Sequence, residues 1–205
     1  MAEPRRRRAA TEQKLTRILD ATEEIILRDG YAGVSSRSVA AAVGIQAPLL
    51  HYYFPTIDDL FVAVLRRRSD QSVDRMSVAL MSAQPLRAWW KLVSDSRGTA
   101  LLLELLAAAN HRPPLRDEVG KAAHEVRRMQ VETLTAILDE YGLDLVEFPP
   151  VLIAATMQGL AFAVVADQVA GYDTSPDEAA AAMNRLLARL EKHRAQQLES
   201  RQFQY

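Results

Sequence analysis

Apolar residues recur every three or four positions along most of the chain, the spacing of helices that bury one face. Between residues 11 and 29 this face is formed by Leu15, Ile18, Leu19 and Ile26. The alternating pattern of half-buried strands does not occur, and the sequence contains no repeat. The pattern predicts an all-α fold of about nine helices.

Glycine and proline residues set the expected ends of these helices. No Gly or Pro interrupts residues 57–83, so we expect one helix of roughly 40 Å there, because each residue adds about 1.5 Å. This helix would join the start of the chain mechanically to the rest. The full set of expected helices is 11–29, 35–43, 46–53, 57–83, 85–96, 99–111, 115–141, 149–171 and 175–197.

The two short helices within residues 35–54 are joined by a turn at Gly44. Ser35 or Ser36 is a suitable N-cap for the first, because a serine hydroxyl accepts an unpaired backbone N–H. Pro48 lies in the first turn of the second helix, where its missing N–H costs nothing. Such a pair is the helix-turn-helix pattern, whose second helix enters the major groove of DNA.

Four features of the N-terminal third occur together in a known family. An amphipathic helix is followed by DGYAGVSSRSVAAAVGI, then by LLHYYF, and then by the acidic helix start PTIDDL. From Thr11 to about Leu65 the chain therefore resembles the N-terminal domain of the TetR family of bacterial transcription regulators. The resemblance implies a three-helix DNA-binding domain at 11–56, preceded by a disordered basic arm at 1–10. It also implies a larger helical domain at 57–205 for effector binding and dimerisation.

The distribution of charge agrees with DNA at the N-terminal end. The chain has a net charge of −1, but residues 1–55 hold eight Lys/Arg against six Asp/Glu, which is a net of +2. The remainder therefore carries a net of −3. Arg5, Arg6, Arg7 and Arg8 form the densest basic run, and we expect them to lie along phosphates or in the minor groove.

The resemblance also implies which side chains meet DNA. Arg37 would contact a base edge or phosphate, with Ser36 beside it on the backbone, and Arg pairs bidentately with guanine. From the second helix, Gln46 would reach a base edge or phosphate, Ala47, Pro48 and Leu49 would give apolar contacts, and His51 and Tyr52 would bind phosphate oxygens. The chain departs from the family pattern at His51, where an aromatic is usual, and at Ile57, where a lysine often stands.

The helical remainder is expected to hold an effector pocket, as in the family, and the candidate lining is mostly apolar. Trp89 and Trp90 are adjacent on one helix, so we expect one of them to reach a cavity or a partner chain. A lining with few polar groups favours a hydrophobic or aromatic ligand. The candidates are Met76, Leu80, Trp89, Trp90, Leu103, Leu106, Met129, Thr133, Met157, Gln158 and Phe162.

The last two helices, about 149–171 and 175–197, are expected to pair with a second copy as a four-helix interface, through Met183, Leu186, Leu187 and Leu190. A two-fold homodimer would place two recognition helices on half-sites roughly 34–36 Å apart or more, and its operator would be palindromic. Effector binding would shift the population toward a state whose helix spacing no longer matches that operator.

Other chemistry finds little support. The chain has no cysteine, and its four histidines show no metal-ligand spacing, so we expect no metal, no cofactor and no enzymatic activity. No signal peptide is present, and Gln158, Asp167 and Gln168 interrupt the apolar stretch 151–171, which favours a buried or interface helix in a cytoplasmic protein.

Two alternatives stay open. The first is a helical small-molecule carrier or enzyme with an incidental helix-turn-helix, although a carrier needs neither Arg37 nor the basic run. The second is a DNA-binding protein with a solid core and no effector.

Overall fold

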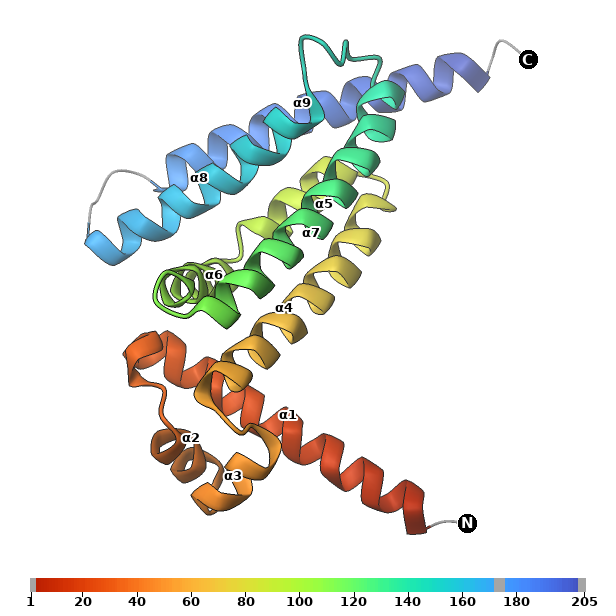
Figure 1. Ribbon diagram of the computed structural model, residues 1–205. Helices are drawn as coiled ribbons and strands as arrows, with labels where there is room; N and C mark the ends of the chain where they lie inside the picture. Colours follow the sequence, from red (N-terminus) through yellow and green to blue (C-terminus); the bar gives the residue numbers. More distant parts are fainter. Residues whose placement is uncertain (1–2, 172–175, 203–205) are drawn as a thin grey trace. The chain divides into compact units, whose positions relative to one another are not determined.

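The computed structural model describes the backbone of residues 3–171 and 176–202 and the side chains of 9–171 and 178–192. These residues form nine α-helices and one 3-10 turn, with no strand among them, which confirms the predicted all-α fold. The elements are α1 (Glu3–Asp29), η1 (Tyr31–Gly33), α2 (Ser36–Val43), α3 (Ala47–Tyr53), α4 (Ile57–Leu80), α5 (Pro85–Val93), α6 (Ser96–Ala109), α7 (Pro113–Glu140), α8 (Pro150–Ala170) and α9 (Pro176–Gln202) (Figure 1).

The prediction of a disordered arm at 1–10 is wrong for residues 3–10, because α1 begins at Glu3. Arginine and alanine are strong helix formers, and Pro4 is tolerated in a first helical turn. The arginine run therefore extends the helix that follows it. The side chains of Arg5, Arg6, Arg7 and Arg8 are outside the described residues, so their expected DNA contacts stay a prediction.

The helices divide into two compact units. The N-terminal unit contains the residues up to Ser69 together with Ala100–Ala122, and the C-terminal unit contains Asp70–Thr99 and the residues from Ala123 onward. Helices α4, α6 and α7 each contribute residues to both units. The division by packing therefore differs from the boundary expected near Ile57, because the first turns of α4 belong to the same core as α1 to α3.

One apolar core fills the N-terminal unit. Residues of α1 and α4 form the centre of this core, and each is at most 2% exposed. They are Ile18, Ile25 and Ile26 of α1 and Leu60, Phe61 and Val64 of α4. Residues distant in sequence complete this core: Leu101, Leu105, Ala108 and Ala109 of α6 and Leu115 of α7. Burial of apolar area is the dominant stabilising term, so α6 and the start of α7 are structural parts of this unit.

Charged side chains connect the helices of the N-terminal unit around this core. Arg67 of α4 donates to Asp20 of α1 at 2.7 Å and also pairs with Glu23. Arg112 pairs with Asp58 and lies 4.8 Å from the centre of the Phe61 ring, a cation–π contact. A second arginine of α4, Arg66, donates two hydrogen bonds to Glu118 of α7, at 2.7 and 2.9 Å.

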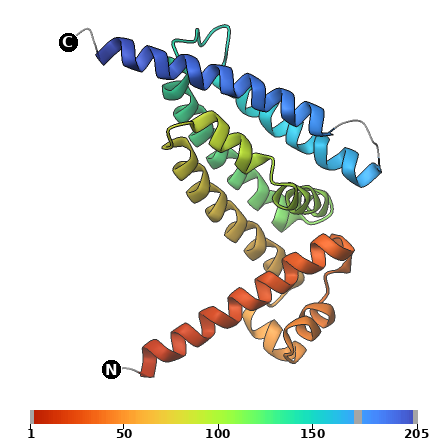
Figure 2. The same ribbon diagram turned by 180° about the vertical axis from the view of Figure 1, so that it is seen from behind.

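The C-terminal unit has its own apolar core, built from the rest of α4 and α7 with α5, α8 and α9 (Figure 2). Trp89 and Trp90 are 1% and 2% exposed, and both belong to this core. Helix α5, which carries both rings, packs against α8 and α9. The expectation that one of the two rings reaches a cavity or a partner chain stays a prediction.

A buried carboxylate joins three helices of the C-terminal unit. Glu191 of α9 is 6% exposed and accepts hydrogen bonds from the backbone N–H groups of Leu86 and Arg87, at 3.0 and 3.3 Å. Tyr141, which follows α7, donates its hydroxyl to the same carboxylate at 2.5 Å. Glu191 thereby satisfies N–H groups in the first turn of α5 that no residue of α5 itself caps.

Helix α8 is apolar but largely uncovered. Ala154, Met157, Ala161 and Val165 form its buried stripe, whereas Leu152 and Val169 are 55% and 83% exposed. Within the described residues, its 21-residue length and mean hydropathy of 1.6 are those of a helix able to cross a membrane, and 22% of that stretch is buried. Figure 2 shows α9 running beside it, which leaves the other side of α8 open in a single chain.

Candidate nucleic-acid interface

The short helix α2 is set by its caps. Ser35 accepts a hydrogen bond from the backbone N–H of Ser38 at 3.1 Å, and Ser38 Oγ accepts one from the backbone N–H of Ser35 at 2.9 Å. This reciprocal capping box confirms Ser35 as the N-cap. At the other end Gly44 has φ 69° and ψ 37°, the left-handed conformation that costs glycine little.

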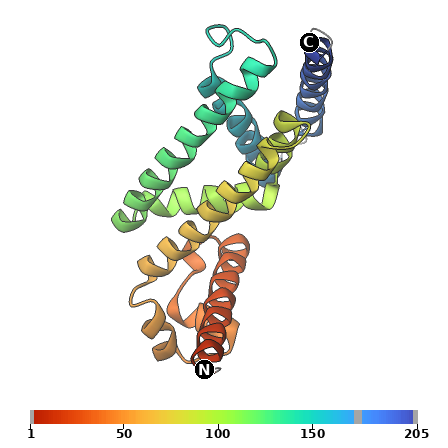
Figure 3. The ribbon, with the colours of Figure 1, turned by 90° about the vertical axis from the view of Figure 1, so that its right-hand side faces the viewer.

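Helix α3 follows directly and is anchored by one side chain. Leu50 is 1% exposed within the core, while Tyr53 and Phe54 are half-buried against it. The helix begins at Ala47 with Gln46 as its N-cap and Pro48 in its first turn, one residue later than predicted. Helix α2 packs against α1, and α3 packs against α2 (Figure 3), in the arrangement expected of a helix-turn-helix.

Two long-range bonds fix this pair on the unit. Arg17 of α1 donates to the carbonyl oxygen of Val43 at 3.3 Å, which satisfies a carbonyl at the end of α2. Glu104 of α6 accepts the backbone N–H of Tyr31 at 2.8 Å. Gly30, just before it, has φ +72°, and a Cβ there would lie 3.4 Å from the Glu104 carboxylate. The segment entering α2 is therefore held from both sides.

The residues expected to touch DNA lie in the first turn of α2 and on α3 or its N-cap. Arg37, Gln46, Pro48, His51 and Tyr52 are exposed, whereas Ser36, Ala47 and Leu49 are half-buried. No acidic residue occurs between residues 30 and 57, so this surface presents no side-chain carboxylate to a phosphate. We call the eight residues the α2–α3 surface.

Two members of the α2–α3 surface, His51 and Tyr52, already contact other residues of the protein. His51 Nδ1 lies 3.3 Å from the carbonyl oxygen of Pro55, so this nitrogen carries the proton and donates it locally. The other ring nitrogen of a neutral His51 is then an acceptor, and it donates to a phosphate only when the ring is protonated. Tyr52 is 79% exposed and its ring meets that of Tyr53 edge-on, with centroids 5.2 Å apart.

The predicted ligand residues are divided between the two units. Leu103 and Leu106 lie in the N-terminal unit, and the other nine lie in the C-terminal unit. Five of those nine are core residues below 9% exposure, and Met129 packs against them. Thr133, Gln158 and Phe162 are half-buried. The five core residues are Met76, Leu80, Trp89, Trp90 and Met157.

One polar atom in that core has no partner. The indole nitrogen of Trp89 is buried and donates no hydrogen bond within the described residues. A buried donor without an acceptor costs about 1–3 kcal/mol, and such atoms in native proteins mark a water, an ion or a ligand.

The predicted dimer residues of α9 face different ways. Leu187 is 3% exposed and belongs to the core of its own chain, so its expected role at an interface is wrong for this conformation. Met183 and Leu190 are half-buried against the same core, and Leu186 is 52% exposed. A 3.6-residue period makes one stripe of such residues, but α9 packs that stripe against α5 and α8.

A surface pocket of about 590 Å³ lies in the N-terminal unit, and the sequence did not indicate it. None of the predicted ligand residues lines it, whereas Tyr52 of the α2–α3 surface does. Among the described residues, no three His, Cys, Asp or Glu side chains gather in a way that would hold a metal ion.

Residues 18–64 match the family model for bacterial regulatory proteins of the tetR family. This range contains α2, α3 and the start of α4, which is the part of the chain that carries the resemblance in the sequence.

Known relatives are transcriptional regulators. The chain is 27% identical over 137 residues to PksA, an HTH-type transcriptional regulator of Bacillus subtilis, covering 64% of this chain and 67% of PksA. It is 38% identical over 73 residues to the HTH-type transcriptional repressor KstR of Mycobacterium tuberculosis, covering 34% of this chain and 33% of KstR. The chain thus spans two thirds of one relative and one third of the other.

The fold recurs in solved structures. A transcriptional regulator from Saccharomonospora viridis, solved in complex with choline, superposes with a TM-score of 0.69 at 19% identity, over 86% of this chain and 96% of that one. These relatives are regulators rather than enzymes, in agreement with the predicted lack of enzymatic activity.

Proposed function

We propose that the chain, whose residues 18–64 match the tetR family model, is a DNA-binding transcriptional regulator of that family. We further propose that it is a homodimeric repressor released from a palindromic operator by a small, mainly hydrophobic ligand. The observation that carries this proposal is the α2–α3 surface. It exposes one arginine in the first turn of the capped helix α2 and one glutamine at the start of α3, with no acidic residue between residues 30 and 57.

In this proposal only a few side chains recognise DNA bases directly. Arg37, exposed in the first turn of α2, offers a bidentate pair to guanine, and Gln46 offers an amide at the start of α3. Tyr52 and His51 bind phosphates, which position the protein without reading sequence. The arginines at the start of α1 add phosphate contacts and compensate for Ile57.

A second copy of the chain would cover α8. Most of the side chains that α8 presents to water are small or apolar, and Thr156 and Gln168 are the polar ones. Its exposed residues are Val151, Leu152, Ala155, Thr156, Gly159, Ala163, Ala166, Gln168, Val169 and Ala170. Exposed apolar surface of this kind is typical of an interface, and an interface between identical chains is most often two-fold. We propose that α8 and Leu186 of α9 are covered by the second chain, and not by a membrane, in a cytoplasmic dimer formed through the last two helices.

An effector would bind within the C-terminal unit. Its core is apolar apart from a few groups, and the unpaired indole N–H of Trp89 favours a ligand with one hydrogen-bond acceptor over a solid core. The relative from Saccharomonospora viridis binds choline, also a small molecule. Helix α4 contributes residues to both units and would carry the change in population to the DNA-binding surface.

Binding of the purified protein to DNA from its own promoter region tests this proposal. We expect affinity to fall steeply as salt rises, because phosphate contacts release counterions. Arg37→Ala should weaken binding to the specific site by about 5- to 150-fold, the equivalent of about 1–3 kcal/mol. A random duplex of equal length should be affected much less.

Arg28→Ala is the matched control, because Arg28 is an equally charged, exposed residue that pairs with Asp29 at the end of α1. It should leave both affinities unchanged. Absence of specific binding at low salt would refute the proposed function, and an equal loss on both duplexes would make Arg37 a phosphate contact only.

A further inference from the structure

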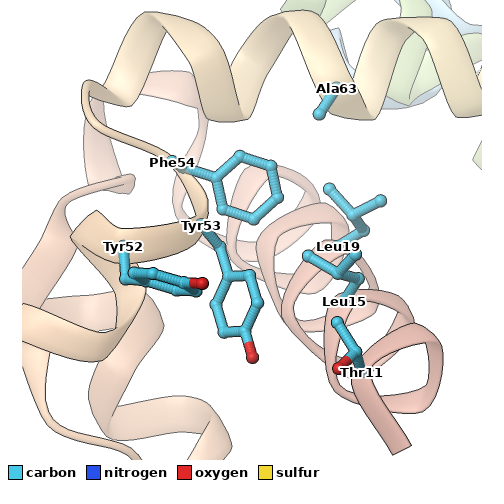
Figure 4. Close-up of a pocket in the computed structure, with 7 residues that line it drawn as sticks. All are labelled: Thr11, Leu15, Leu19, Tyr52, Tyr53, Phe54 and Ala63. Atoms are coloured by element: carbon cyan, nitrogen blue, oxygen red, sulfur yellow. The ribbon is translucent and has the colours of Figure 1, made fainter. Parts of the chain in front are cut away.

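The N-terminal unit contains a pocket that the proposed function does not use. Its volume is about 590 Å³, and it is lined by Thr11, Leu15 and Leu19 of α1, by Tyr52, Tyr53 and Phe54 at the end of α3, and by Ala63 of α4. Figure 4 shows the rings of Tyr53 and Phe54 on one side and the two leucines on the other. Small-molecule sites typically have volumes of about 300–1,000 Å³.

We propose that this pocket is a second ligand site, in the DNA-binding domain itself, for a small planar aromatic molecule with a polar substituent, and that its occupation weakens DNA binding. The sequence creates the space with Ala63, which lies between the large core residues Phe61 and Val64 on the same helix. A larger residue at 63 would fill it.

The lining selects the chemistry of the occupant. Three of its seven residues are aromatic, and aromatic rings associate with other rings edge-on or offset. The Tyr53 and Thr11 hydroxyl oxygens lie toward the same end in Figure 4, where a polar substituent would meet them. No charged side chain lines the pocket, which disfavours an ionic ligand. A partner helix, about 10–12 Å across, needs a longer groove than these seven residues provide.

The walls of the pocket differ in how firmly they are held. Arg67, one turn beyond Ala63 on α4, bonds to the carbonyl oxygen of Thr16 and to Asp20, within the turns of α1 that carry Leu15 and Leu19. The α1 and α4 walls are thereby tied together. The third wall is the end of α3, where Tyr53 and Phe54 are only half-buried.

A ligand that packs against this third wall acts on the recognition helix directly. Tyr52, on the pocket lining, is also a member of the α2–α3 surface, where it is expected to meet a phosphate. Suppose that the ligand binds more tightly to a conformation in which α3 is displaced from its DNA-bound position. The ligand must then lower the affinity for DNA, and DNA must lower the affinity for the ligand by the same factor.

The test uses 2-naphthol as the probe and the full-length protein with labelled leucine methyl groups. Titration should shift the methyl signals of Leu15 and Leu19, and saturating probe should lower affinity for promoter DNA at least fivefold. DNA should lower the affinity for the probe by the same factor. Ala63→Leu should abolish the methyl shifts, whereas Ala136→Leu, the same change at an exposed position of α7, should not.

Tyr53→Phe keeps the ring and removes only the hydroxyl, so it tests the site if Ala63→Leu folds poorly. It should lower the affinity for 2-naphthol about 3- to 10-fold, which corresponds to the usual contribution of one hydrogen bond. Shifts confined to methyl groups of the C-terminal unit, or shifts that survive Ala63→Leu in a folded protein, would overturn the site and leave the proposed effector pocket standing. Unchanged DNA affinity at saturation would overturn its effect on DNA binding.

Discussion

The N-terminal unit and the C-terminal unit each pack helices around one apolar core, but they place their polar bonds differently. In the N-terminal unit two arginine pairs each join one exposed side chain to one that is mostly covered: Arg66 (62% exposed) with Glu118 (15%), and Asp20 (61%) with Arg67 (17%). In the C-terminal unit the carboxylate of Glu191 and the hydroxyl of Tyr141 are buried together. Buried polar groups cost far more when a partner is lost than exposed ones do.

The two units also differ in what they leave open. The N-terminal unit covers its apolar residues except at the pocket beside α3, whereas the C-terminal unit leaves one side of α8 uncovered. The first unit therefore has the surface of a finished domain with a polar DNA-binding face. The second leaves apolar residues of α8 exposed, and we propose that a second copy of the chain covers them.

The largest effect is expected on the uncovered side of α8. Ala163→Arg places a charge at an exposed position of that helix and should convert the proposed dimer into a monomer of 22.8 kDa. Loss of one half-site contact should lower operator affinity by at least about a thousandfold, or about 4 kcal/mol. Light scattering after size exclusion measures the mass, and a titration of operator DNA measures the affinity.

Arg189→Ala, an exposed change on α9 that adds no charge, serves as the comparison and should leave the mass unchanged. A dimer that persists in Ala163→Arg would show that another surface joins the two chains.

A smaller effect is expected from the buried carboxylate. Glu191→Ala leaves the N–H groups of Leu86 and Arg87 and the hydroxyl of Tyr141 without their acceptor, which should cost about 3 kcal/mol of unfolding free energy. Tyr141→Phe removes only the hydroxyl and should cost about 1 kcal/mol. Both tryptophans lie in the C-terminal unit, so their fluorescence in denaturant reports that unit alone.

Far-ultraviolet circular dichroism, which follows all helices, provides the comparison. If fluorescence and circular dichroism report the same loss of unfolding free energy in Glu191→Ala, the two units unfold together, and the energetic contrast between them does not hold.

The third change removes the bonds by which Arg67 of α4 holds α1 in the N-terminal unit. Arg67→Met keeps the aliphatic stem but removes the bonds to Asp20, Glu23 and the carbonyl oxygen of Thr16. Because Arg67 and Glu23 are largely buried, we expect a loss of about 1–2 kcal/mol. Circular dichroism should report this loss of unfolding free energy, whereas the unfolding transition followed by tryptophan fluorescence should change much less.

The features that the sequence predicted well are those with local signals. Ser35 and Gly44 occupy their expected cap and turn positions, because each is determined by neighbours within a few residues. For the same reason the helices that were expected along the chain are present, most of them with ends shifted by one to three positions, whereas α1 begins eight residues earlier and α9 ends five residues later than expected.

What the sequence did not predict depends on residues far apart in the chain. The bond from Glu104 to the backbone of Tyr31 brings α6 into the N-terminal unit, and no local pattern indicates it. Burial of both Trp89 and Trp90 depends on α8 and α9 lying on two sides of α5. The pocket beside Tyr53 follows from Ala63 meeting α1 across the core, and alanine by itself signals no cavity.

The smallest effect is expected at the exposed pair of Arg66 and Glu118. The guanidinium of Arg66 lowers the pKa of Glu118 below its ordinary value of 4.5, mainly through the hydrogen bonds between them. A carboxyl whose pKa is lower in the folded state stabilises the fold above its unfolded pKa and loses that contribution as pH falls. Since Arg66 is mostly exposed, Glu118→Gln should cost less than about 1 kcal/mol at pH 7. The difference from the unaltered protein should shrink as the pH of thermal unfolding experiments falls below about 4.5, whereas the cost of Tyr141→Phe should persist there for as long as the C-terminal unit stays folded. A cost for Glu118→Gln that stays constant down to pH 3 would mean that side-chain packing, and not the charge of the pair, connects α4 and α7 in the N-terminal unit.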